Sequence, residues 1–103
     1  MKKGEVWYGN FPPPIGKRPI VILSRDEACA ARNSVTVAEI TTRIWNIAVE
    51  VPLGPEDGLP KQCVANLDTI TTVNKRFLTD RISLLSSKKM EEIHKALKFA
   101  LDI

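Results

Sequence analysis

The chain has few of the residues that usually bind metals or exchange protons in enzymes. Its 103 residues include two cysteines, Cys29 and Cys63, and one histidine, His94. These three residues are dispersed and no CxxC pair occurs, so we predict no metal site and no cofactor. A single histidine on a terminal helix cannot supply the usual pair of histidine acid and base, and it is most often a surface residue.

Long apolar segments are also missing. No hydrophobic run approaches the roughly 20 residues that span a bilayer. The first residues, Met1–Glu5, are basic, but no apolar segment of the kind found in signal peptides follows them. Two isolated cysteines without CxxC spacing are typical of reduced, partly buried thiols. We therefore expect a cytoplasmic protein that does not bind membranes.

The overall composition is that of a soluble globular protein. Hydrophobic residues make up 44% of the chain and charged residues 26%, both ordinary values. A chain of this length forms one domain with a modest core, so we expect a single domain over residues 1–103.

Positive charge is in slight excess and unevenly distributed. Lys and Arg total 15 and Asp and Glu total 12, a net charge of +3 that permits an anionic partner without requiring one. If the fold brings the basic stretches together, the protein has a basic face; scattered solvating charges are the alternative. The stretches contain Lys2, Lys3, Lys17 and Arg18, and then Lys75, Arg76 and Arg81.

Short strands separated by turn signals dominate the pattern. Three consecutive prolines stiffen a loop at 11–16, and residues 25–32 have the composition of one or two helical turns. Residues 68–73 either continue the fifth strand or begin another. The pattern predicts a mainly β protein, a small barrel or a sandwich, without selecting the barrel type. The expected strands are 5–8, 18–24, 35–42, 47–51, 62–67 and 81–85, with Pro52 ending the fourth.

The last segment predicts an α-helix that covers an open face of the sheet. Ser86 or Ser87 can cap its first turn. Apolar residues recur at helical spacing and form one face. That face consists of Met90, Ile93, Leu97, Ala100 and Leu101.

Arg18 occupies the most informative position in the chain. It follows Gly16 and Lys17 and precedes Pro19, which opens the apolar run Ile20–Leu23. Such a run fits a strand buried on both faces. A permanently charged, forked guanidinium at the junction of loop and strand is well placed to hold an anion. A solvated charge at the end of a strand is the alternative.

Segments along nearly the whole chain match one protein family in order: Gly4–Trp7, Pro14, Gly16, Arg18–Ser24, Val37–Thr41, Val64–Val73, Lys75, Leu78, Ile82, and Leu84–Ser86 with the helix after it. On these residues the chain resembles the MazF/PemK/Kid toxins, the toxin halves of bacterial type II toxin–antitoxin pairs. The resemblance implies an SH3-like barrel with helical additions that works as a homodimer. It also implies a sequence-selective, metal-independent endoribonuclease that cuts single-stranded RNA and is silenced by a cognate antitoxin.

The family's catalytic arginine falls on Arg18 and its catalytic threonine on Thr41. RNA can be cut without a metal because its own 2′-OH can attack the adjacent phosphate. Arg18 can then neutralise phosphate oxygens, and Thr41 can add a hydroxyl donor, although a threonine in a strand is often there for β-propensity alone. Glu39 should share a strand face with Thr41, as a base, as an organiser of Arg18, or simply as a strand acid.

Further RNA contacts are expected around Arg18. Phe11 and Trp45 could stack on unpaired bases, and partial burial is the alternative for both rings. Lys17 and Arg43 are candidate phosphate contacts, which position the strand without reading its sequence. An antitoxin would need an acidic, largely disordered segment that folds across these cations.

Two departures from the family bear on specificity. The loop before Arg18, residues 12–17, contains no acidic or amide side chain, whereas many members have a Gly-Ser-Glu-Gln run there. The common Asp-Gln-Ile-Arg segment is Asp68–Thr71 here and lacks an amide and a cation. The resemblance therefore does not carry a substrate preference across to this chain.

Two other functions fit the same barrel. A gyrase poison would be a binding inhibitor that relies on a C-terminal tryptophan, and this chain has none after Trp45. A catalytically silent module that binds RNA or an antitoxin stays open on the sequence.

Overall fold

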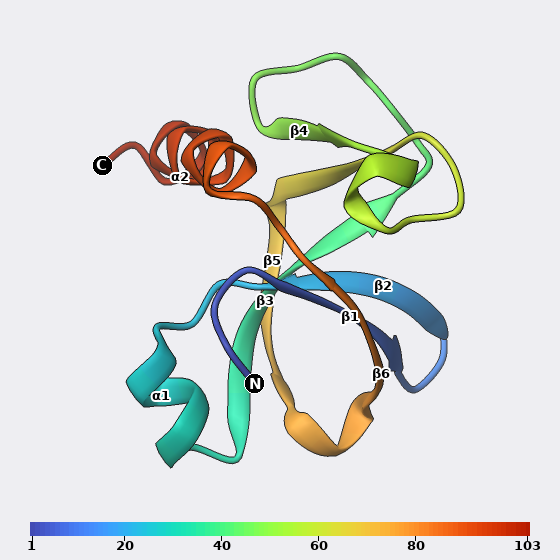
Figure 1. The fold of residues 1–103 in the computed structure, drawn as a ribbon, viewed down its shortest axis with the longest axis vertical. Helices are drawn as coiled ribbons and strands as arrows, with labels where there is room; N and C mark the ends of the chain where they lie inside the picture. The colour runs from blue at the N-terminus through green and yellow to red at the C-terminus, as the bar shows by residue number, and fades with distance from the viewer.

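One antiparallel sheet of six strands forms the body of the protein (Figure 1). The computed structural model describes residues 1–103. Short 3₁₀ helices, η1 (Pro55–Asp57) and η2 (Lys75–Phe77), lie before and after β5. The other elements are β1 (Glu5–Asn10), β2 (Lys17–Ile22), α1 (Asp26–Ala31), β3 (Ser34–Thr41), β4 (Glu50–Leu53), β5 (Cys63–Asn74), β6 (Leu78–Leu84) and α2 (Ser87–Leu101).

The strands are ordered β4-β5-β3-β2-β1-β6, and the sheet curls (Figure 1). All five strand pairs are antiparallel. The predicted fold class, mainly β with a C-terminal helix on a small barrel-like sheet, is confirmed. The sandwich alternative is wrong because the strands form one continuous sheet.

A register shift between β3 and β5 shapes the sheet. Ala38 pairs with Ile70, whereas the next residue, Glu39, pairs with Asn66. Three residues of β5, 67–69, therefore have no partner on β3. An odd number of extra residues reverses which face the following side chains occupy. Ile70 consequently packs against the same core as Leu67.

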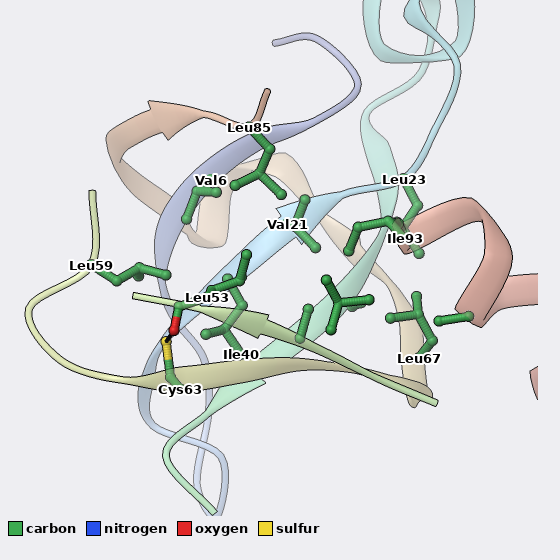
Figure 2. Close-up of a cluster of buried hydrophobic side chains, with 14 residues drawn as sticks. Val6, Val21, Leu23, Ile40, Leu53, Leu59, Cys63, Leu67, Leu85 and Ile93 are labelled. Atoms are coloured by element: carbon green, nitrogen blue, oxygen red, sulfur yellow. Dashed lines mark hydrogen bonds between the residues drawn. The ribbon is translucent and has the colours of Figure 1, made fainter. Parts of the chain in front are cut away.

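The curled sheet encloses a larger and a smaller core on its two faces. Along β3, Ala38 and Ile40 enter the larger core, and Val35 and Val37 enter the smaller one. Figure 2 shows the larger core, with Ile93 of α2 among strand residues. The smaller core consists of Phe11, Ile20, Ile22, Cys29, Val35, Val37 and Leu78.

Helix α2 begins where the sequence predicts it. The Ser86 hydroxyl caps the helix by accepting a hydrogen bond from the Lys89 N–H at 3.1 Å. Ile93 and Ala96 are buried against the larger core. Leu101, expected on the apolar face, is the last residue of α2 and is instead 49% exposed.

Several boundaries differ from the expected ones. β4 lies at 50–53, so Pro52 is inside the strand; an edge strand tolerates proline because its outer N–H groups need no partner. Residues 68–73 continue β5, so the fifth strand is long and bent. β6 begins at Leu78, three residues before the predicted start. α1 and the loop at 11–16 lie where they were predicted.

Cys29 and Cys63 are free and buried, as predicted. Burial raises the pKa of both thiols, which keeps them protonated and unreactive. No helix in the structure is long and apolar enough to cross a membrane.

A buried carboxylate joins the sheet edge to its neighbouring strand. Glu5 on β1 accepts hydrogen bonds from the Trp7 indole N–H and from Arg81 Nε of β6, both at 3.0 Å. The Lys2 backbone N–H donates a third, also at 3.0 Å. Burial alone would raise the pKa of Glu5, but these donors together outweigh it and hold the pKa below its ordinary value.

We predict that Glu5→Gln lowers the free energy of unfolding by about 1–3 kcal/mol at neutral pH, because the donors lose a charged acceptor. The lowered pKa means that the folded state favours the ionised carboxylate. The stabilisation is therefore present above the carboxylate pKa of the unfolded chain and is lost as the pH falls through the lowered pKa. In urea unfolding experiments across the acidic pH range, the free energies of unfolding of wild type and Glu5→Gln should converge at low pH. A difference in unfolding free energy between wild type and Glu5→Gln that does not change with pH would contradict this role. An equal loss of stability in the exposed control Glu91→Gln would contradict it as well.

Candidate functional site

Arg18, Glu39 and Thr41 lie on one face of the sheet. Strands β2 and β3 pair with Ile20 opposite Glu39, and Arg18 is two residues before Ile20, on the same face. The Arg18 guanidinium donates from Nη1 to Glu39 Oε1 at 2.5 Å. Glu39, for which the sequence left a base, an organiser of Arg18 and a strand acid open, is therefore in direct contact with Arg18.

Two pockets meet at Arg18 and Thr41. The first has a volume of about 230 Å³, and its lining includes the buried apolar residues Ile40 and Leu59. The second has a volume of about 440 Å³ and a mostly polar lining that includes Glu39 and Asn66. The residues common to both are Arg18, Thr41 and Thr42. A ligand bound to Arg18 can therefore extend into a pocket on either side.

The Thr41 hydroxyl is oriented by the chain that follows it. β3 ends at Thr41, and the Arg43 N–H donates to Thr41 Oγ1 at 3.1 Å. The hydroxyl oxygen is thus engaged as an acceptor, and its own proton is free to be donated to a ligand.

Trp45 and Arg43 line the second pocket, and Lys17 lines the first. Trp45 is 63% exposed, so its ring is free to contact a ligand. The Glu50 carboxylate holds this loop by accepting hydrogen bonds from the N–H groups of Trp45 and Asn46. Lys17 Nζ lies 5.0 Å from the centroid of the Tyr8 ring.

The structure corrects the expectation for Phe11. Its side chain is only 7% exposed and belongs to the smaller core. The ring lies over Gly9 and packs against Phe77, with 6.1 Å between ring centroids. A buried ring has no free face for a nucleobase, so Phe11 supports the sheet next to the site and does not stack on RNA.

The lining of the two pockets is strongly basic. It includes four cations, Lys17, Arg18, Arg43 and Lys61, and a single carboxylate, Glu39. Sequence reasoning missed Lys61, which lies in the turn-rich segment before β5, and it also missed Glu50. The only signal for Lys61 in the sequence was a basic residue in a turn-rich segment, and such a signal does not show that the loop brings Lys61 to the first pocket.

The second basic stretch does not line either pocket. Arg81 pairs with Glu5, and Arg76 lies over the Phe77 ring at 5.0 Å. Lys75 donates to the Cys29 carbonyl. These side chains stabilise the fold elsewhere, so the two basic stretches do not form one surface at the candidate site.

His94 is a surface residue of α2, away from both pockets. Burial and the nearby Lys3 and Lys98 lower its pKa. No three His, Cys, Asp or Glu side chains come together in the way that metal binding requires.

The fold and the site define a small curled-sheet protein with a basic site made of two pockets. The comparisons with known proteins agree with this class. A sequence model of the PemK-like, MazF-like toxins of type II toxin–antitoxin systems matches residues 2–101. The chain therefore belongs to this toxin family, and the resemblance stated from the sequence is confirmed.

Relatives match over most of their length. The probable endoribonuclease MazF5 of Mycobacterium tuberculosis is 39% identical over 101 residues, which cover 97% of this chain and 92% of the relative. The endoribonuclease MazF of Staphylococcus saprophyticus is 31% identical, and the match covers 100% of this chain and 92% of the relative. A solved mycobacterial endoribonuclease in complex with its cognate antitoxin superposes with a TM-score of 0.89 at 28% identity. The superposition covers 100% of this chain and 96% of the solved chain.

Proposed function

We propose that this toxin is a sequence-selective endoribonuclease that cuts single-stranded RNA without a metal ion. The observation that carries the proposal is the position of Arg18 and Thr41, side by side where two pockets meet. A phosphodiester at that point would have one flanking nucleotide in each pocket. Relatives over nearly the whole chain are named endoribonucleases.

The chemistry uses the RNA's own 2′-OH as the nucleophile. Its oxygen attacks the adjacent phosphorus, and the bond from phosphorus to the 5′ oxygen of the next nucleotide breaks. The products are a 2′,3′-cyclic phosphate and a 5′-hydroxyl. Negative charge grows on the phosphate oxygens as the bond forms, so preorganised donors stabilise the transition state more than the ground state.

Arg18 and Thr41 supply those donors. Arg18 has five N–H groups, and only one is used by Glu39 in the structure. The others can form parallel bonds to phosphate oxygens, and the free Thr41 proton adds another. A preorganised donor of this kind typically contributes about 3–4 kcal/mol to a transition state.

The remaining cations and Trp45 hold the strand. Lys17, Arg43 and Lys61 would contact flanking phosphates, which fixes the position of the RNA without reading its bases. The exposed Trp45 ring would stack on an unpaired base, worth about 1–3 kcal/mol. Stacking of this kind favours single strands, because the bases of a duplex already stack on one another.

The toxin would act as a cytoplasmic homodimer with an antitoxin partner. Large apolar side chains, among them Ile44, Ile47 and Leu84, are exposed in the single chain and could be buried by a second copy. An acidic, disordered segment of the antitoxin would fold across Lys17, Arg18 and Arg43.

The first test is cleavage itself. We predict that labelled single-stranded RNA is cut in excess EDTA and that the 5′ fragment ends in a 2′,3′-cyclic phosphate. A matched RNA with 2′-deoxyribose at the cut site should bind and resist cleavage, because it lacks the nucleophile. Efficient cutting of the deoxy substrate would point to a water nucleophile. Binding without any cleavage of the all-ribose RNA would identify a silent RNA-binding module.

Arg18→Ala and Thr41→Ala should each abolish most cleavage while the protein stays folded. Losing one phosphate donor should slow turnover on the order of 100- to 1,000-fold. Arg25→Ala is the matched control, because Arg25 is exposed and its side chain forms no ion pair. Full activity of a folded Arg18→Ala protein would refute the site assignment.

Antitoxin binding should compete with RNA and weaken with salt, because part of the attraction is between exposed charges. The experiment titrates the antitoxin segment into toxin saturated with the deoxy-substituted RNA, at low and at high ionic strength. We expect a large loss of apparent affinity in the presence of RNA. Simultaneous binding with unchanged affinity would place the antitoxin outside the RNA site.

A further inference from the structure

Glu39 is the one carboxylate among the residues that line the two pockets. Its side chain is 17% exposed, against 38% for its partner Arg18. Attack by a 2′-OH requires a group that takes the proton from that hydroxyl, and neither Arg18 nor Thr41 supplies one. The inference that follows rests on the proposed ribonuclease function and addresses this missing proton acceptor.

The other groups around the site are unsuited to accept a proton. Ammonium, guanidinium and phenol groups ordinarily keep their protons at neutral pH, whereas carboxylates have lost theirs. The Cys63 thiol in the first pocket has its pKa raised, by burial first and by the acidic residues Asp57 and Glu56. His94 lies outside both pockets.

One oxygen of Glu39 is free for chemistry. Oε1 accepts the bond from Arg18, and Oε2 has no hydrogen-bond partner in the protein. No buried side-chain oxygen or nitrogen in the structure lacks a partner, so Oε2 is accessible to solvent and to a ligand. A phosphate on the free N–H groups of Arg18 would therefore lie next to an oriented, accessible carboxylate oxygen.

We propose that Glu39 is the general base of the cleavage reaction. Oε2 takes the proton from the 2′-OH as the bond between O2′ and phosphorus forms. The bond from phosphorus to O5′ then breaks, and O5′ takes a proton from water. Glu39 releases its proton to solvent, which neutralises the hydroxide and restores the carboxylate. Arg18 binds the phosphate and, through Oε1, fixes the orientation of the base.

This role makes opposite predictions for binding and for turnover. The negative charge of Glu39 repels RNA phosphate and reduces the charge that Arg18 presents. Removing that charge should leave RNA binding unchanged or make it tighter. Removing a general base should slow the chemical step, typically by 100- to 10,000-fold. A residue that only holds Arg18 in place would instead weaken binding when it is removed.

The decisive variant is Glu39→Gln, whose amide oxygen can still accept the bond from Arg18 but cannot take up a proton. We expect the dissociation constant for the deoxy-substituted RNA to be equal to or lower than that of wild type, and kcat to fall at least 100-fold. A second substrate has sulfur in place of the bridging O5′. Its thiolate leaves without protonation, so the defect in removing the 2′ proton should persist on it.

Glu91→Gln, the same charge change on the exposed face of α2, is the control and should cleave like wild type. A kcat for Glu39→Gln within threefold of wild type would overturn the proposal, as would weaker RNA binding with unchanged kcat. Recovery of the Glu39→Gln rate on the sulfur substrate would also overturn it, because Glu39 would then protonate the leaving group.

Wild-type protein on all-ribose RNA separates this inference from the proposed function. If wild type does not cleave, the ribonuclease assignment itself fails; if it cleaves and Glu39→Gln cleaves equally, only the base assignment fails. Circular dichroism checks the fold of each variant. Glu39→Asp retains a carboxylate and should recover part of the kcat lost in Glu39→Gln. The remaining loss of kcat in Glu39→Asp should persist on the sulfur substrate, as expected for a base that acts on the 2′-OH.

Discussion

The register shift between β3 and β5 is the constraint on which the rest of the structure depends. The three residues that have no partner on β3, 67–69, bend β5 and reverse the faces of the residues after them. Leu67 and Ile70 can therefore both pack against the larger core, and Val73 packs against the smaller one. The bend also coincides with the step from Ala38 to Glu39; beyond it one face of β3 presents Glu39 and Thr41, while Ile40 on the other face still packs in the larger core.

The site follows from this arrangement by simple alternation along strands. Ile20 and Val37 fill the smaller core, and the residues two positions further toward the site on the same face are Arg18 and Glu39. The apolar strand β2 thus has the cation Arg18 near its beginning, beside the site, because Arg18 precedes the apolar run. The neighbouring strand β3 has the acid Glu39 and the hydroxyl of Thr41 among its last residues, at the same end of the sheet. The ion pair between Arg18 and Glu39 places a guanidinium and a carboxylate side by side; in the mechanism we propose, the first binds the phosphate and the second accepts the proton.

Much of the fold could be predicted from local patterns, and the junction of loop and strand drew attention to Arg18, whereas Thr41 was singled out only by the resemblance to the toxin family. Apolar runs and turn signals located most strands, the cap at Ser86 located α2, and alternation placed Glu39 on the face of Thr41. The rest depends on tertiary packing that no local pattern encodes. The burial of Phe11 against Phe77 and Gly9, the arrival of Lys61 at the first pocket and the support of the Trp45 loop by Glu50 all join residues whose spacing carries no signal. Pro52 led to a wrong end for the fourth strand, because the sequence does not show that this strand lies at the edge of the sheet, where a proline is tolerated.

The most direct test of the central claim, that the scissile phosphate binds at Arg18 between the two pockets, is a nuclear magnetic resonance titration. Protein labelled with ¹⁵N would be titrated with single-stranded RNA that has 2′-deoxyribose at the cut site. We expect the side-chain N–H signals of Arg18 and the backbone signals of Thr41 and Thr42 to shift most, while the signals of α2 around His94 stay unchanged. Unchanged Arg18 signals with the largest shifts on α2 or around Arg76 would contradict this claim.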